Sequence, residues 1–267
     1  MTTPATGGAP AADGDANGRS DIQAVSRVSR ILGLFNVDRT ELVTADVALR
    51  LGLNRTTTHR YLTSMVAVGL LEPGSRHSSY VVGPLATRLG AMATGSSPAL
   101  AEAPRHMPAL ADELGATVAL SLWASTGPMV VHVAEPRVAD AVLTVRVGTV
   151  LGVDSAQGAV FAAYLPRGAS RIEVLRARLD RARQEEFDRT VAAARRDGVV
   201  IVRHTDVGVV AVAAPIFDPS GICASIAAVG LAGSATEAAV PERVERVRAA
   251  ADRMSTVLGG ERPTSAE

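Results

Sequence analysis

Two helix-forming segments separated by one glycine constrain the fold of this chain more than any other feature of its sequence. The first segment, residues 41–51, is expected to have Thr44 as its cap and to end at Gly52. Asn54 is placed to cap the second helix, which has one apolar and one polar face. The apolar residues of the second helix recur at three- and four-residue steps, so we expect them to point inward. The inward stripe comprises Thr58, Tyr61, Leu62, Met65 and Gly69.

The segments before and after these two helices are predicted to form a further helix and a β-hairpin. Residues 22–35 carry apolar side chains at helical spacing, which predicts a preceding helix. Residues 70–83 predict two short strands around a turn at Pro73-Gly74. Three helices followed by a hairpin are typical of a winged helix-turn-helix, in which the polar face of the third helix meets the major groove of DNA.

The candidate DNA contacts lie on that polar face and at the tip of the hairpin. The chain contains no lysine, so its permanently charged basic side chains are all arginines, whose planar forks suit phosphates and guanine edges. Which residues contact bases and which contact phosphates stays open, and a solvated helix face or turn is the alternative interpretation. The candidates are Asn54, Arg55, Thr56, Thr57, His59, Arg60, Thr63, Arg76 and His77.

The rest of the chain has a different character. Residues 1–20 hold little that a core can bury and are expected to form a disordered tail. A helical segment over 84–100, interrupted at 95–98, predicts a linker helix. Residues 101–260 mix β-rich and helical runs, which predicts an α+β or α/β domain around a central sheet. Among these runs, "AVLTVRVG" is expected to be β-rich, and the charged segment 169–198 is expected to be one long helix with a solvated face.

Composition and motifs exclude several other classes of protein. No apolar run reaches the roughly 20 residues that cross a bilayer, and the N-terminus lacks the pattern of a secretory signal. The only cysteine, Cys223, is expected to be a small buried residue, and its lack of a disulfide partner points to the cytoplasm. The histidines show no zinc-ligand spacing, so we expect neither metal nor cofactor. A catalytic C-terminal domain, with the winged helix used for protein contact, is the alternative, although no nucleophile elbow, P-loop or dinucleotide-binding motif is present.

Four segments, in their order and spacing, resemble IclR-type transcriptional regulators across residues 21–260. They are "GLNRTTTHRYL", "GLLEPGSRHSSYVVG", "VRVGTVLGVDSAQGAVFAA" and "GVVAVAAPIFDPSGICASIAAVG". The resemblance implies a winged helix-turn-helix over 21–83, joined by a linker helix to a GAF-like α/β effector-binding domain over 101–260. It also implies a homodimer or homotetramer on double-stranded operator DNA, with recognition helices about 34 Å apart. Helices 22–35 and 84–92 are expected to form the dimer contact.

The resemblance also indicates where an effector would bind. Relatives that bind small carboxylates tend to carry hydroxyl or thiol groups on the late strands, where this chain has alanine and valine. That difference favours an apolar or aromatic effector, with Gln157, His132 or His204 supplying a polar contact. Asp206 is a further loop candidate, and core packing is the alternative for all of the apolar positions. The effector candidates are Leu143, Ala156, Gln157, Ala211, Ala227 and Val229.

Overall fold

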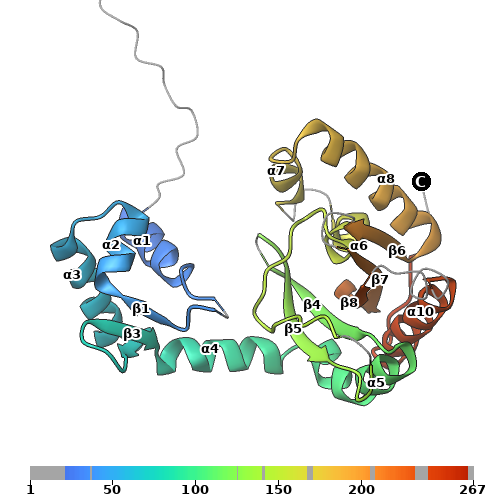
Figure 1. The fold of residues 1–267 in the computed structure, drawn as a ribbon, viewed down its shortest axis with the longest axis horizontal. Coiled ribbons are helices and arrows are strands. Elements are labelled where there is room, and N and C mark those ends of the chain that lie inside the picture. Colours follow the sequence, from blue (N-terminus) through green and yellow to red (C-terminus); the bar gives the residue numbers. More distant parts are fainter. Residues whose placement is uncertain are drawn as a thin grey trace, which may run out of the picture. The chain divides into compact units, whose positions relative to one another are not determined.

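The chain divides into two compact units, of which the first includes Arg39–Gly83 and the second includes Asn36–Asp38 and the chain from Pro84 onward (Figure 1). The structure, a computed structural model, describes residues 22–36, 38–124, 126–139, 142–166, 171–204, 208–231 and 240–263. The predicted tail over residues 1–20 and the loop candidate Asp206 lie outside the described residues. Helices and antiparallel sheets occur together, and the prediction of an α+β chain with an N-terminal helix-turn-helix is confirmed.

The first unit contains three helices: α1 (Gln23–Leu32), α2 (Thr44–Leu51) and α3 (Arg55–Ala67). Gly52 ends α2 in the left-handed conformation, with φ +65°, which suits a residue without a Cβ atom. Two residues later Asn54 caps α3, so the local signals that predicted a helix-turn-helix are the ones that form it.

The start of α2 differs from the prediction. Residues 41–43 are not helical but form strand β1 (Glu41–Val43), and Thr44 is the first helical residue rather than its cap. The Thr44 hydroxyl donates to the carbonyl oxygen of Ser78 at 3.1 Å, so it ties α2 to the hairpin. The predicted Thr44 cap is therefore wrong, because the hairpin offers its hydroxyl an acceptor outside the helix.

The hairpin strands are β2 (Leu71–Pro73) and β3 (Ser79–Val82), and the sheet has the order β1-β3-β2. Both pairings are antiparallel, with Val81 of β3 opposite Glu41 on one side and Glu72 on the other. One apolar core holds this sheet and the three helices together. Its buried members are Ile31, Leu42, Val47, Leu62, Met65, Leu71 and Tyr80.

The second unit begins with α4 (Pro84–Gly95) and α5 (Pro98–Leu114), and the predicted interruption between them is present. Its sheet has five antiparallel strands in the order β5-β4-β8-β7-β6. The strands are β4 (Thr117–Ala124), β5 (Gly127–Ala134), β6 (Val200–His204), β7 (Val209–Asp218) and β8 (Gly221–Leu231).

Helices cover both faces of this sheet (Figure 1). On one face, α5 and α10 (Val240–Val257) pack against β4, β7 and β8 in the largest apolar core. On the other face lie α6 (Ala156–Tyr164) and α8 (Arg181–Asp197). The sheet therefore separates the core beneath α5 and α10 from two further apolar clusters, both of which contain residues of α6.

Two sequence predictions in this unit are wrong. The run "AVLTVRVG" forms no regular strand over its described residues 142–148, and only Val150, just beyond it, makes a bridge to Met129. The long helix predicted over 169–198 is two helices, the short α7 (Ile172–Arg176) and then α8. Asp180 separates them because its carboxylate accepts from the backbone N–H of Arg183 at 2.9 Å and so caps α8.

Candidate nucleic-acid interface and ligand site

The first turn of α3 is fixed by its cap. The Asn54 side-chain oxygen accepts from the backbone N–H of Thr57 at 2.7 Å. The Thr58 hydroxyl donates to the Asn54 carbonyl at 2.9 Å, and Thr58 is fully buried, as predicted. The Asn54 side chain thus keeps its N–H groups and one lone pair of its oxygen for a partner, and the cap fixes the direction in which the following side chains project.

The exposed face of α3 carries most of the predicted DNA contacts. Arg55, Thr56, His59 and Arg60 are exposed, and Thr57 is partly exposed. Thr63 is exposed too, but its hydroxyl lies within hydrogen-bond distance of the His59 and Arg60 carbonyls, at 2.9 and 3.1 Å. That hydroxyl is therefore engaged with its own helix, while the two arginines make no ion pair with any described residue.

A groove of about 600 Å³ separates α3 from the hairpin and from the start of α2. From α3, Arg55, Thr56 and His59 line it, and His77 and Ser78 line it from the hairpin. A second hollow, of about 450 Å³, lies between Thr63 and the residues Arg76 to Tyr80. The structure thus brings the wing candidates Arg76 and His77 to the same side of α3 as His59 and Thr63.

Glu41 of β1 organises the tip of the hairpin. Its carboxylate accepts from the backbone N–H groups of Ser75 at 2.7 Å and Arg76 at 3.3 Å, and from the Ser79 hydroxyl. It also makes an ion pair with the Arg76 guanidinium at 3.3 Å. The Ser79 hydrogen bond, helped by those of Ser75 and Arg76, lowers the pKa of Glu41 to about 2. Sequence reasoning missed Glu41, because it was placed in a helix and nothing local shows that β1 pairs with β3.

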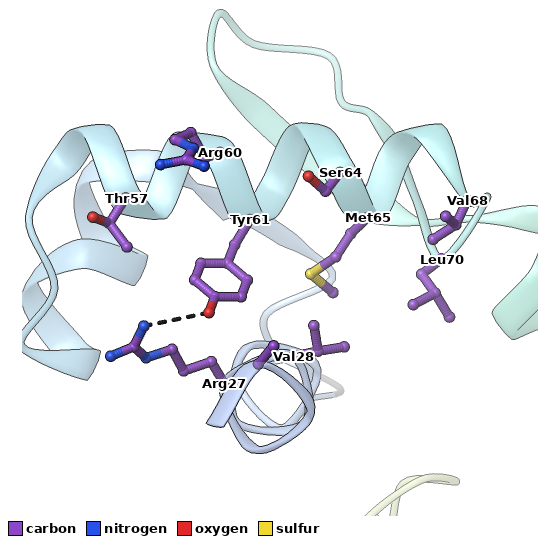
Figure 2. Close-up of a pocket in the computed structure, with 10 residues that line it drawn as sticks. Arg27, Val28, Thr57, Arg60, Tyr61, Ser64, Met65, Val68 and Leu70 are labelled. Carbon is purple, nitrogen blue, oxygen red and sulfur yellow. Dashed lines mark hydrogen bonds between the residues drawn. The ribbon is translucent and has the colours of Figure 1, made fainter. Parts of the chain in front are cut away.

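A third groove, of about 560 Å³, runs along the other side of α3, between α3 and α1. Tyr61 and Met65 point from α3 toward α1, whereas Arg60 and Ser64 lie farther from α1 (Figure 2). Arg27 of α1 donates to the Tyr61 hydroxyl at 3.3 Å, and its guanidinium carbon lies 5.8 Å from the centre of the Tyr61 ring. Arg27 was not among the predicted contacts, since its place beside α3 comes from tertiary packing.

In the second unit the structure brings four of the six effector candidates together. Ala156 of α6 packs in one apolar cluster with Ala211 of β7 and with Ala227 and Val229 of β8. Leu143 is not in that cluster; its carbonyl accepts from the Thr117 hydroxyl at 2.7 Å. The four clustered side chains form an uncharged apolar patch on the α6 face of the sheet.

Gln157 is buried beside this cluster, and the protein itself satisfies its amide. The side-chain oxygen accepts from the Ser121 hydroxyl at 2.8 Å. The side-chain nitrogen donates to the Ser225 carbonyl at 2.8 Å and to the Ala119 carbonyl at 3.2 Å. Gln157 therefore fixes α6 to β4 and β8, and a ligand would find only one lone pair of its oxygen without a partner.

The structure places the side chain of only one of the two histidines, His132 and His204, that are predicted to make a polar contact with the effector. His132 pairs in register with Leu120, which packs in the core beneath α5 and α10, so His132 projects to the sheet face opposite α6. Partial burial lowers its pKa. His204 is the last residue of β6, and its side chain is outside what the structure describes. His132 is thus placed away from the alanine and valine cluster.

Trp123 and Cys223 of this unit make contacts within the protein itself. Trp123, at the end of β4, contacts Phe161 of α6 with ring centres 5.5 Å apart. The Cys223 thiol donates to the Ile216 carbonyl at 3.4 Å, and burial raises the pKa of this thiol to about 12. A thiol with such a high pKa is a poor nucleophile, in keeping with a packing residue.

Over the described ranges, no three His, Cys, Asp or Glu side chains are grouped so that they could hold a metal ion. None of the helices in the part of the chain that the structure describes is both long enough and apolar enough to span a bilayer.

Comparisons with known proteins agree with both units. The model of the "IclR helix-turn-helix domain" matches residues 24–74, and that of the "Bacterial transcriptional regulator IclR C-terminal" matches residues 92–256. A curated relative, the HTH-type transcriptional regulator XynR of Escherichia coli (strain K12), is 28% identical over 145 residues. That match covers 54% of this chain and 57% of XynR, so it spans little more than half of the relative.

Solved structures share the fold over most of the chain. A putative IclR transcriptional regulator from Silicibacter sp. TM1040 has a TM-score of 0.76 at 23% identity, covering 90% of this chain and 98% of that one. HmgR of Pseudomonas aeruginosa has a TM-score of 0.66 at 26% identity, covering 88% and 97%. An IclR homolog from Microbacterium hydrocarbonoxydans, solved with 4-hydroxybenzoate, has a TM-score of 0.69 at 26% identity, covering 88% and 98%.

Proposed function

Because the chain belongs to the IclR family of bacterial transcriptional regulators, we propose that it binds operator DNA as a homodimer or homotetramer and responds to a small apolar or aromatic effector. The family consists of regulators rather than enzymes, and we assign no catalytic residue. Operator DNA also places the protein in the cytoplasm. The observation that carries the DNA-binding proposal is the exposed, unpaired cationic face of α3.

That face has the properties a major-groove surface needs. Arg55, His59 and Arg60 project from a helix whose cap and buried stripe fix its position. Arginine forks donate to guanine edges or to phosphates, and threonine hydroxyls to either. Arg76 and His77, which share the neighbouring hollows with α3, are proposed to contact the backbone or minor groove beside it.

Exposed apolar side chains support the proposed dimer. At the start of α1, the N-cap residue Ile22 is 67% exposed and Val25 is 63% exposed. In α4, Leu89 and Met92 are 52% and 64% exposed. Side chains of this size on two helices favour burial against a second copy, which is where the resemblance places the dimer contact.

For the effector, the apolar character of the cluster on the α6 face supports the proposed class. Ala211, Ala227 and Val229 offer methyl groups and no charge, so a small highly charged ligand would lose its hydration there without compensation. The relative bound to 4-hydroxybenzoate shows that a protein with this fold takes an aromatic acid. We propose an aromatic or apolar ligand between α6 and strands β7 and β8, held against the Gln157 region.

Footprinting of the purified protein on the DNA upstream of its own gene tests the proposed function. We expect protection of two half-sites about one helical turn apart, or a multiple of that spacing, with an affinity that falls steeply as salt rises. Binding that showed no preference for any fragment, or no salt dependence, would contradict the proposal.

Small aromatic acids added to the same footprint test the ligand site. Ala227→Trp is expected to abolish the response to an active acid, because an indole in place of this buried methyl group repacks the cluster with Ala156 and Val229 where the ligand is proposed to bind, while DNA binding without ligand is kept. Isothermal titration of the acid against wild type and variant measures the loss directly. A variant that still responded would place the ligand elsewhere.

A further inference from the structure

The groove between α1 and α3 is polar and positively charged at one end. Arg27, Thr57, Arg60, Tyr61 and Ser64 all line it, and no acidic side chain is among the described residues that do. The remaining lining residues are largely apolar, and they are Ala24, Val28, Met65, Val68 and Leu70. Arg27 lies on the α1 side of this hollow, and Thr57, Arg60, Tyr61 and Ser64 lie on the α3 side, so the polar lining contains two guanidinium groups and three hydroxyl groups.

Arg27 is held in place without being neutralised. One of its five N–H groups donates to the Tyr61 hydroxyl, and its planar group lies near the Tyr61 ring. No described carboxylate forms an ion pair with it. A cation that is fixed in direction but still lacks an anion is ready to bind one without a further loss of side-chain freedom.

The position of this groove on α3 identifies the anion. A helix about 10–12 Å in diameter fills a major groove about 12 Å wide, so the sugar-phosphate strands of the duplex run along both flanks of the helix. One flank of α3 faces the hairpin with His59 and Thr63, and the other faces α1 with Thr57 and Tyr61. Arg27 therefore stands where the second backbone passes.

We propose that the polar end of the α1–α3 groove binds a backbone phosphate of the operator, with Arg27 as the contact and Tyr61 as the residue that positions it. The inference rests on the proposed DNA-binding function, which it extends from α3 and the wing to the first helix. A phosphate contact does not depend on the base sequence, so this contact contributes equally to the affinity for the operator and for unrelated duplex DNA.

Fluorescence anisotropy with the operator fragment and with an unrelated duplex, over a range of salt concentrations, tests the proposal. Arg27→Gln is expected to weaken binding to both duplexes by about tenfold for each protomer bound, the usual cost of one charged hydrogen-bonded contact. The slope of log affinity against log salt should also become shallower by about 0.9 for each protomer bound. Arg30→Gln is the matched control, since Arg30 is exposed on the same helix but does not line the groove.

Tyr61→Phe separates positioning from direct contact. It keeps the ring and removes the hydroxyl that accepts from Arg27, so we expect a smaller loss, of about threefold, with an unchanged salt slope. In the Arg27→Gln background the same change should have no further effect. Thermal unfolding of each variant shows whether the fold is kept.

The outcomes are distinct. A wild-type protein that binds DNA, together with an Arg27→Gln variant whose affinity and slope are both unchanged, overturns the phosphate contact alone. A selective loss on the operator, with unrelated duplex unaffected, also overturns it, because that result assigns Arg27 to base recognition. A wild-type protein that binds no duplex overturns the proposed function as well.

Discussion

Ion pairing of arginine differs between the two units. In the second unit, many arginines pair with nearby carboxylates, as Arg137 does with Asp112, Arg176 with Asp188 and Arg246 with Glu113, whereas the buried Arg243 makes no ion pair with a described residue. In the first unit, Arg27, Arg55 and Arg60 make no ion pair with any residue that the structure describes. An arginine that is paired with a carboxylate already has its anion, whereas arginines without an ion pair on one face remain available to phosphates. The comparison thus separates a nucleic-acid surface from a solvated one, although both contain the same side chain.

Arg76 is the exception in the first unit, since Glu41 neutralises it at the hairpin tip. The carboxylate also binds the backbone of the tip, so the pair shapes the wing as well as reducing its charge. The wing is therefore expected to contribute less to the salt dependence of DNA binding than α3 does.

The largest expected effect comes from removing the unpaired cations of α3. Arg55→Ala and Arg60→Ala should each weaken operator binding by about tenfold or more, and the double variant by about a hundredfold, because each fork contacts a guanine edge or a phosphate. Anisotropy with the operator fragment measures the loss, and thermal unfolding should show an unchanged midpoint. Full operator affinity in the double variant would remove α3 from the interface.

A smaller effect is expected from changing Glu41, which pairs with Arg76 at the hairpin tip. The pKa of Glu41 is lowered to about 2, so its carboxylate contributes stability above its ordinary pKa of 4.5, and that contribution is lost as pH falls from about 4.5 toward 2. Glu41→Gln removes the ionisable group, so the stability of the variant should change less over that range. Hydrogen exchange at the amides of Ser75 and Arg76, measured over the pH series, reports on the wing itself. Equal pH dependence in wild type and variant would show that Glu41 does not order the tip.

The smallest effect is expected from a paired arginine. Arg176→Gln removes the ion pair with Asp188 in the second unit and one unit of positive charge from the protein. Because this arginine already has its anion and lies outside the proposed interface, operator affinity and the salt slope should be unchanged. A loss comparable to that of Arg55→Ala would mean that total charge, and not the α3 face, determines binding.

Local signals predicted the helix-turn-helix well. Gly52 in its left-handed turn, the Asn54 cap and the inward Thr58 all act within a few residues of their own position, so the sequence displays them directly. Asp180 is a similar local signal: it lies inside the segment predicted as one helix, and its side chain caps α8 and so divides that segment.

The features that could not be predicted from the sequence depend on contacts between residues far apart in the chain. Residues 41–43 become a strand only because β3, almost forty residues later, offers them an edge, and their own pattern fits a helix equally well. Arg27 lies inside the helical pattern predicted over 22–35, and it acquires its significance only where α1 packs beside Tyr61. Gln157 was selected by resemblance, and its three internal hydrogen bonds depend on two distant strands.

The contact between Trp123 and Phe161 has a practical consequence. The chain has a single tryptophan, and it lies in the second unit against α6, the helix that carries Ala156 and Gln157. Light absorbed selectively by indole therefore gives an emission signal that originates beside the proposed ligand site, while the winged helix contributes none. Occupancy by an aromatic acid can be followed by quenching of this native fluorophore, without a dye and independently of whether DNA is present.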